Sequence, residues 1–560
     1  MQRFLRSSRP LAVLLAVASV AGPAYGADAG RLAASEQAFL DYLDAQGAAA
    51  YIESGGVDRY QGRDLADWQR LAAGRRKALE SDLDAVARSR IGSADAAALT
   101  AMRRTLASLD ADDVTTGPRE PDCKDARRPE LDYASMRAAL VSCFVEHGNR
   151  LAFEGATIDR GEALQLLHVV DESARRRAIF DAFLPLWTAL NGRNEPDSPY
   201  RRLIAMAAAE VARHGSEIDR AAQAIGVGTV DVERWLVEVL EVWREVSGRQ
   251  AVEPWDYRYS NSVANRELAA RIPADSLLAA NERFYRDLGA DLRSLAVVLD
   301  LAPRPDKSPL AYTDFLARGR RVDGAWHRPV ARVVGTYATG GLFSLNELVH
   351  ENGHAVHVSA IHTRPAYMDW PDSLFAEAFA DVPSWSVYEP AWQCRYLGAG
   401  VPEAVALRAL FGDVMLDIAW SLFEIRMLRD PKSDPNAVWT EITSRYLNVV
   451  PHPEVPWWAM RVQLASDPGY MVNYGLGAVL TAEMRAKAVE VIGPFDAGNA
   501  AWYPWLGERL LRFGSERDTR SLMQSLLGRP PSPEALAMQL RRAGSQEAGS
   551  NAAPVLGCTP

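Results

Sequence analysis

Residues 350–354 read His-Glu-Asn-Gly-His, a spacing that brings two imidazoles to one face of a helix. At about 100° per residue, His354 lies only ~40° from His350 around the helix axis, and Glu351 lies ~100° from it. Zinc binds two such nitrogens and one carboxylate oxygen, and its fourth coordination position stays open. Glu351 can then take the proton of a zinc-bound water as that water attacks a carbonyl. The pentapeptide therefore predicts a hydrolase with one Zn2+ per chain and Glu351 as its catalytic base.

The third ligand must come from outside this pentapeptide. His357 follows on the same helix, which cannot bend its side chain onto the same ion, so we expect it to be buried or hydrogen-bonded. Glu377 is the better candidate, since it and Asp381 lie one turn apart on an otherwise apolar segment. Buried carboxylates need a positive partner, and the alternative is a solvated acidic pair. We predict that Glu377 binds the zinc and that Asp381 accepts a hydrogen bond from the outer nitrogen of a ligand histidine and so orients it.

Both ligand-bearing helices have candidate start signals in the sequence. Ser344 and Glu347 have the spacing of a capping box, which would begin the first helix. Asp372 or Ser373, after Pro371, can cap the second helix. The sequence therefore predicts where both helices begin, which fixes the side of each helix on which the ligands lie.

Most of the remaining chain is predicted to be helical. Apolar residues recur at three- and four-residue spacing in several charged segments, namely 62–90, 161–192, 203–247, 276–299 and 402–428. Strand-like stretches are rare, and the clearest is 330–339, ahead of two glycines. Beyond 528 the composition shifts to Pro, Gly, Ser and Ala, which predicts one short helix and a loose tail. We expect a mainly α protein with a small β-sheet next to the zinc helix.

The amino terminus has the pattern of an export signal. Arginines at 3, 6 and 9 precede an apolar run from 11 to 21, and small residues follow at 24 and 26. The run is shorter than the ~20 residues that span a membrane. We therefore expect an exported protein, periplasmic or secreted, without a membrane anchor after cleavage. The expected parts are a signal peptide (1–26), an N-terminal helical region (27–150), a zinc peptidase catalytic region (151–527) and a loose C-terminal tail (528–560).

Composition and charge exclude several other classes. The chain has 560 residues with 48% hydrophobic and 24% charged residues, which is ordinary for a soluble globular protein. A net charge of -10 does not favour phosphate backbones, so we expect no nucleic-acid partner. Four cysteines are too few for a disulfide scaffold, although Cys123 and Cys143 are close enough in sequence to pair after export. We expect a monomer.

The stretch from His350 to His357, with its glycine and trailing histidine, resembles the thimet-oligopeptidase family of zinc peptidases. Glu377 followed four residues later by Asp381 is similar to the pattern of angiotensin-converting enzyme, a more distant relative. Segments 171–176, 254–259 and 469–474 also resemble oligopeptidases, so the resemblance spans roughly 150 to 510.

This resemblance implies a two-lobed helical metallopeptidase with a deep central channel that admits short peptides and excludes folded proteins. The strand before the zinc helix would line the cleft and pair with the substrate backbone. Tyr474, and also Tyr470, would donate a hydrogen bond to the developing oxyanion. A family histidine is replaced here by Ala465. His452 is a candidate substitute for it, with a structural role as the alternative.

Three functions are weighed on these grounds. The leading one is a zinc-dependent peptidase that hydrolyses peptide bonds of short oligopeptides. The first alternative is a dipeptidyl carboxypeptidase of the angiotensin-converting type, for which Arg461 is a candidate partner of the substrate carboxylate. The second is a degenerate, non-catalytic peptide-binding protein. The intact Glu351 argues against that second alternative, since a binder needs no base beside its metal.

Overall fold

The protein is mainly helical, with short strands in small sheets, as the sequence predicts. The computed structural model describes residues 23–89, 91–112, 121–248, 250–304, 307–308, 311–544 and 556–558. The predicted signal peptide falls almost wholly outside the described residues, apart from its last residues at the start of the first helix. No helix in the described ranges combines the length and the apolar character that a membrane span requires.

The described residues form helices along most of the chain, with several strands in the long interval between residues 287 and 342. The helices are α1 (Pro23–Gly55), α2 (Leu65–Ala87), α3 (Ser93–Asp112), α4 (Tyr133–Cys143), α5 (Arg160–Val169), α6 (Ser173–Asp181), α7 (Leu184–Asn191), α8 (Pro199–His214), α9 (Glu217–Ile225), α10 (Thr229–Val246), α11 (Tyr257–Asn261), α12 (Val263–Leu268), α13 (Leu277–Asp287), α14 (Leu342–Ala360), α15 (Ser373–Ser384), α16 (Pro390–Leu397), α17 (Glu403–Arg429), α18 (Pro435–Tyr446), α19 (Gln463–Ser466), α20 (Val472–Ile492), α21 (Trp502–Arg509), α22 (Thr519–Leu527) and α23 (Glu534–Ala543).

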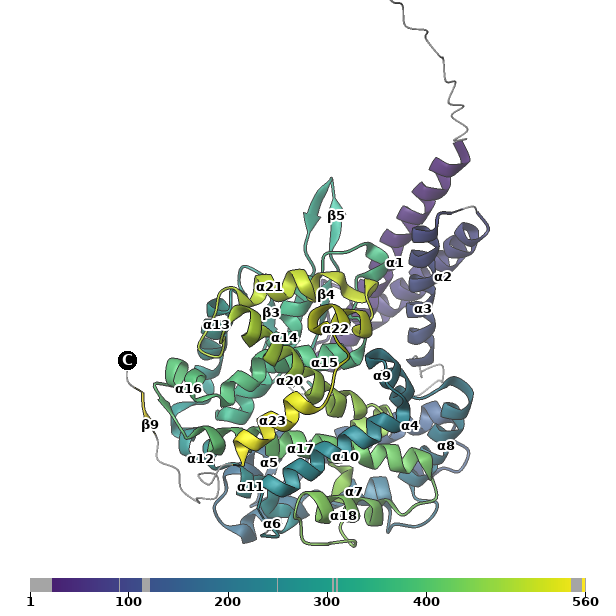
Figure 1. The fold of residues 1–560 in the computed structure, drawn as a ribbon. Coiled ribbons are helices and arrows are strands. Elements are labelled where there is room, and N and C mark those ends of the chain that lie inside the picture. Colours follow the sequence, from purple (N-terminus) through teal and green to yellow (C-terminus); the bar gives the residue numbers. More distant parts are fainter. Residues whose placement is uncertain are drawn as a thin grey trace, which may run out of the picture.

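Two hydrophobic cores divide these helices into two lobes. The smaller core joins α1, α2 and α3 to the sheet beside α14, with Leu40, Leu79 and Met102 fully or almost fully buried. Figure 1 shows these three helices side by side at one edge of the molecule. The larger core holds most of the other helices and is rich in buried tryptophans such as Trp420 and Trp439. The two-lobed helical fold expected from the family resemblance is thus confirmed.

The zinc-motif helix α14 passes from the larger core to the smaller one. Leu345 and Leu348 in its first half belong to the larger core, whereas Ala355 and Val358 near its end belong to the smaller. Burial of apolar side chains on both sides fixes the helix firmly, since each such side chain contributes roughly 1.5–3 kcal/mol. The predicted ligands therefore lie where the two lobes meet.

The sheet beside α14 has the order β3-β7-β4, with β3 (Val298–Asp300) parallel and β4 (Tyr312–Ala317) antiparallel to β7 (Val330–Val334). The strand predicted over 330–339 is β7, which ends at Val334. The prediction that this strand pairs with substrate is wrong, because both edges of β7 are already hydrogen-bonded. The end of the predicted stretch, residues 336–339, does line a cavity. No strand of the described residues pairs with the outer edge of β4, which is the edge open to a peptide.

Two smaller strand pairs lie away from this sheet. β1 (Leu151–Phe153) pairs with β2 (Ala156–Ile158), and β5 (Arg320–Val322) pairs with β6 (Ala325–His327) in a hairpin. That hairpin protrudes from the body of the molecule in Figure 1.

The predicted start of α14 is also wrong. Gly341 is the N-cap, and no side chain closes the first turn. Ser344 lies inside the helix, where its hydroxyl donates to Oε1 of Gln165 at 3.0 Å. A side chain from α5 thus takes the hydrogen bond that the capping box would have used. The second predicted start is confirmed, because Asp372 caps α15 through a 2.8 Å bond from the Phe375 amide.

The carboxyl-terminal region contains the expected short helix. α23 packs against α10, α17 and α20, so residues 534–543 belong to the body and not to a loose tail. Beyond it, β9 (Leu556–Gly557) pairs with β8 (Ala399–Gly400), and Cys558 forms a disulfide with Cys394. The predicted pairing of Cys123 with Cys143 is present as a second disulfide. The first of these bonds joins the residue after β9 to α16, and the second joins the short 3-10 turn at 123–127 to α4.

Candidate metal centre

Three ligand-type side chains, His350, His354 and Glu377, converge where α14 meets α15; we call them the metal centre. Nε2 of His350 lies 3.2 Å from Nε2 of His354 and 3.5 Å from Oε2 of Glu377, and the third separation is 3.9 Å. Ligands at zinc-bond length on a tetrahedron lie about 3.4 Å apart. The donor set and its spacing therefore fit a zinc ion, in agreement with the sequence prediction.

A close approach of the two helices makes this convergence possible. A Cβ on Gly353 would lie 2.8 Å from the backbone of Ala380, so only glycine lets α15 come this near. At that distance Asp381 accepts a 2.7 Å hydrogen bond from Nδ1 of His350. The hydroxyl of Ser384 donates to the same carboxylate oxygen at 3.0 Å. The side chain of Asp381 thus orients the His350 ring, as the sequence predicts.

Burial and charge set the protonation of the metal centre. Burial lowers the pKa of His354 to about 3, so this imidazole is neutral and ready to bind a metal. Burial would also lower the pKa of His350, but the charge and hydrogen bond of Asp381 outweigh it and hold that pKa well above its ordinary range. Burial raises the pKa of Glu377, yet its hydrogen bond with His350 and the histidine charges bring it below its ordinary value. Metal binding must then displace a proton from His350.

Glu351 lies beside the metal centre in the same cavity, which has a volume of about 490 Å³. The Thr313 hydroxyl, on the edge strand β4, donates to Oε2 of Glu351 at 2.8 Å. Burial is the main reason that the pKa of Glu351 is raised to about 7. A carboxyl that titrates near neutral pH is suited to accept and return a proton. The position of Glu351 agrees with the predicted base.

Tyr470 and Tyr474 also line this cavity, with their rings edge to face at 5.7 Å. The Tyr470 hydroxyl donates to Oε1 of Glu377 at 3.0 Å. The Tyr474 hydroxyl accepts from Nε2 of Gln463 at 3.3 Å, and no acceptor for its own proton is found among the described residues. Tyr474 is thus the phenol whose proton is free to meet a substrate.

The other histidines lie outside the metal centre. His357 is fully buried among the rings of Trp370, Phe375 and Phe379, and burial lowers its pKa to about 3. His452 lies between two glutamates, Glu253 at 2.7 Å and Glu454 at 2.6 Å.

Since His452 does not line the cavity, it does not substitute for the family's missing histidine, and the structural reading of it stands. Gln463 is the residue whose side chain donates to the Tyr474 hydroxyl, and no pattern in the sequence singles it out.

A larger cavity of about 990 Å³ adjoins the first, and Ser308 lines both. Arg461, the predicted carboxylate partner, lines this cavity but forms an ion pair with Asp417. Arg160 lines it too, and its Nη1 donates to the carbonyl of Met460 at 3.3 Å. Among the described residues, no carboxylate oxygen lies within 4.0 Å of the Arg160 guanidinium. Sequence reasoning missed this arginine, because nothing local marks it as unpaired.

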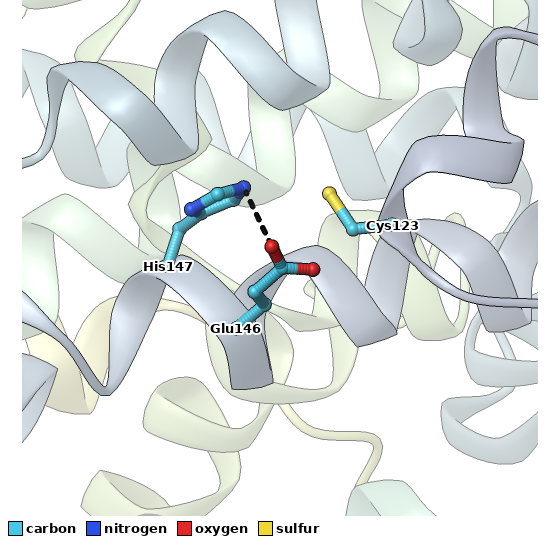
Figure 2. Close-up of side chains that lie close together, drawn as sticks. All are labelled: Cys123, Glu146 and His147. Atoms are coloured by element: carbon cyan, nitrogen blue, oxygen red, sulfur yellow. Dashed lines mark ion pairs between the residues drawn. The ribbon is translucent and has the colours of Figure 1, made fainter.

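A second group of ligand-type side chains, Cys123, Glu146 and His147, also lies close together (Figure 2). We call it the Cys123 cluster. The sulfur of Cys123 is bonded to Cys143, so it is not a thiolate and cannot bind a metal. Nε2 of His147 and Oε1 of Glu146 are 3.9 Å apart. The remaining pair gives a metal only two ligands.

No protein-family model and no curated sequence matches this chain. Solved structures do. The M32 carboxypeptidase from Deinococcus radiodurans R1 is 16% identical with a TM-score of 0.54, over 92% of this chain and 98% of its own. Trypanosoma cruzi metallocarboxypeptidase 1 is 14% identical with a TM-score of 0.53, over 92% and 99%. PZ peptidase A, solved with an inhibitor, is 14% identical with a TM-score of 0.61, over 94% and 98%. The chain has the fold of these peptidases along nearly its whole length.

Proposed function

We propose that this protein is a zinc-dependent peptidase that hydrolyses peptide bonds of short oligopeptides. One observation carries the proposal: a metal centre with zinc spacing shares its cavity with a buried carboxyl, Glu351, whose pKa is near 7. A protein that only binds peptides would not need a proton acceptor at that place.

The chain's own residues supply positioning and proton transfer. A zinc ion held by the metal centre would polarise the scissile carbonyl and acidify a water molecule. Glu351 takes the proton of the attacking water and passes it to the leaving amine. The Thr313 hydroxyl keeps the Glu351 carboxylate turned toward the cavity. Tyr474 donates to the oxygen that becomes negative as the carbonyl carbon turns tetrahedral.

The edge of β4 is the proposed substrate track. Tyr312 and Thr313 line the cavity at the metal centre, and the outer edge of the strand is unpaired within the described residues. An extended peptide laid along it gains backbone hydrogen bonds that do not depend on its sequence. The cavity of about 490 Å³ contains the metal centre, and the one of about 990 Å³ adjoins it and offers further room for a bound peptide.

A second candidate, a dipeptidyl carboxypeptidase, is favoured by Arg160. Its guanidinium lacks a carboxylate partner in the larger cavity, and burial lowers its pKa to about 10. A free substrate carboxylate would complete this group with a charge-assisted pair. Peptides with free and amidated ends, cleaved by wild type and Arg160→Gln, separate the two functions. A carboxypeptidase would cleave amidated peptides poorly, and Arg160→Gln would raise KM only for the free acids.

Metal analysis combined with peptide cleavage tests the leading proposal. Purified protein should contain about one zinc per chain and cleave a set of quenched peptides. Glu351→Gln should keep the zinc and lose roughly 10²–10⁴-fold or more in rate, since an amide cannot accept a proton. An active Glu351→Gln protein would refute the mechanism. Peptide binding without cleavage by the wild type would favour the non-catalytic alternative.

We also propose that the protein is exported and acts as a monomer. The two disulfides support an oxidising compartment, such as the periplasm or the extracellular space. Sequencing the amino terminus of the protein from its native host would test the signal peptide, with cleavage expected after Gly26.

A further inference from the structure

The turn that precedes α20 delivers Tyr470 to the metal centre. Gly469 has a φ of 100°, a left-handed conformation that a side chain would strain. The Tyr470 amide then donates to the carbonyl of Asp467 at 2.9 Å, which closes the turn. The phenol of Tyr470 ends 3.0 Å from Oε1 of Glu377. Small changes in this turn would move the hydroxyl out of hydrogen-bond range.

A buried glutamate from α17 supports this turn from behind. Glu424 is 1% exposed, and each of its carboxylate oxygens accepts one backbone N–H at 2.9 Å. The donors are Gly469 and Met471, the residues on either side of Tyr470. On the same helix, the Ser421 hydroxyl donates to the carbonyl of Met471 at 2.5 Å. The backbone around Tyr470 is therefore held at three atoms by side chains of α17.

Burial of the Glu424 carboxyl is destabilising, so packing alone does not explain its position. Among the described residues its carboxylate forms no ion pair, and its bonds are to the two backbone N–H groups. A buried carboxyl without a cation lowers stability unless hydrogen bonds compensate. Two bonds to backbone N–H groups do so, and they satisfy donors that would otherwise lack partners. Burial of Glu424 by itself lowers the stability of the fold, and in return its carboxylate holds the turn at 469–471 in one conformation.

We propose that Glu424 is a positioning residue: its carboxylate fixes the turn at 469–471 so that the Tyr470 phenol donates to the metal ligand Glu377. The inference rests on the proposed function only in taking Glu377 as a zinc ligand. The hydrogen bond from Tyr470 orients the ligand oxygen and tunes its charge. Glu424 acts on the metal through Tyr470 and never touches it.

A double-mutant cycle on zinc affinity tests this coupling. Zinc affinity is measured by competition with a chromophoric chelator for wild type, Tyr470→Phe, Glu424→Gln and the double variant. Loss of the hydrogen bond to a ligand typically costs about 10–100-fold. Gln can accept only one of the two N–H bonds, so Glu424→Gln should fall in the same range. The double variant should bind zinc no more weakly than the weaker single variant.

Additive losses, or unchanged affinity in Glu424→Gln, would overturn the proposal. Glu483→Gln is the matched control, because Glu483 is also a buried glutamate, 2% exposed, whose carboxylate bonds Arg529 and Ser532 instead of this turn. It should lower thermal stability without changing zinc affinity.

Ser421→Ala is a milder variant should Glu424→Gln fail to fold, and it should shift affinity in the same direction. A crystal structure of metal-free Glu424→Gln gives a readout that needs no zinc. Displacement of the Tyr470 phenol from Glu377 supports the positioning role, and an unmoved phenol overturns it. If wild type binds no zinc, the proposed function fails, whereas the structural result still decides the role of Glu424.

Discussion

The metal centre and the Cys123 cluster each bring three ligand-type side chains within 4.8 Å of one another, yet they differ in every other respect. In the Cys123 cluster the sulfur is consumed by a disulfide, and the side chain of Glu146 is 53% exposed. In the metal centre the side chain of Glu377 is 15% exposed, and the His350 ring is oriented by its bond to Asp381. Proximity of ligand atoms is therefore a weak criterion, and protonation, orientation and burial decide what a cluster can bind.

Their surroundings differ in the same sense. The metal centre opens onto a cavity that also holds Glu351, Tyr470 and Tyr474. None of the cavities described above is lined by a residue of the Cys123 cluster. The metal centre therefore has neighbours that can act on a substrate, whereas the Cys123 cluster has a disulfide at its centre.

The largest expected effect comes from removing one carboxylate from each cluster. Glu377→Ala should weaken zinc binding by about 10³-fold, or roughly 4 kcal/mol, because it removes one of three ligands. Glu146→Ala makes the same chemical change and should leave zinc affinity unaltered. Chelator competition measures both. Full zinc retention in Glu377→Ala would remove the distinction between the clusters.

The second prediction concerns the chemistry around the metal centre. Tyr474→Phe keeps the ring and removes the hydroxyl, so kcat should fall by roughly 10²-fold while KM stays nearly constant. Tyr470→Phe should act more on metal affinity, since its hydroxyl is bonded to Glu377. Steady-state kinetics on one peptide separate the two. Wild-type rates in both variants would mean that the two tyrosines serve only in packing.

The third prediction concerns the orientation of a ligand. Asp381→Asn keeps the size of the side chain and weakens its bond to Nδ1 of His350. Zinc affinity should drop by about 10-fold, the lower end for a partner of a ligand histidine. Isothermal titration with zinc measures it. A larger loss than in Glu377→Ala would mean that Asp381 itself binds the ion.

The smallest effect is expected in the Cys123 cluster. His147→Ala should keep a stoichiometry of one zinc per chain, because this histidine lacks a thiolate beside it. Mild reduction of the disulfide offers the sharper trial, as it frees the sulfur of Cys123. A second bound zinc that appears on reduction and is lost in His147→Ala would show that the Cys123 cluster is also a metal site, which contradicts the distinction between the two clusters.

The sequence predicted the metal centre well because its logic is local. Helical phase places His350 and His354 on one face, and a capping aspartate begins the helix of Glu377. The contact between His350 and Asp381 followed from the need of a buried carboxylate for a partner. Each of these inferences used residues within one helix or one chemical requirement.

The parts that the sequence missed depend on contacts between distant segments. Ser344 fails to cap its helix because Gln165 from α5 binds it. The strand at 330–334 lies inside the sheet because β3 and β4 pair with its two edges. Glu424 reaches the turn of Tyr470 from another helix. No pattern along the chain reports such pairings.

The disulfide between Cys394 and Cys558 has a consequence for biosynthesis. Its partners are 164 residues apart, whereas Cys123 and Cys143 are only 20 apart. A chain that emerges from its amino terminus can close the short ring first, and Cys394 must then stay reduced until Cys558 is made. Closing the earlier ring removes the two competing thiols from exchange. The order of synthesis thus leaves Cys558 as the partner of Cys394. The yield of correctly paired protein then depends on when the oxidant acts.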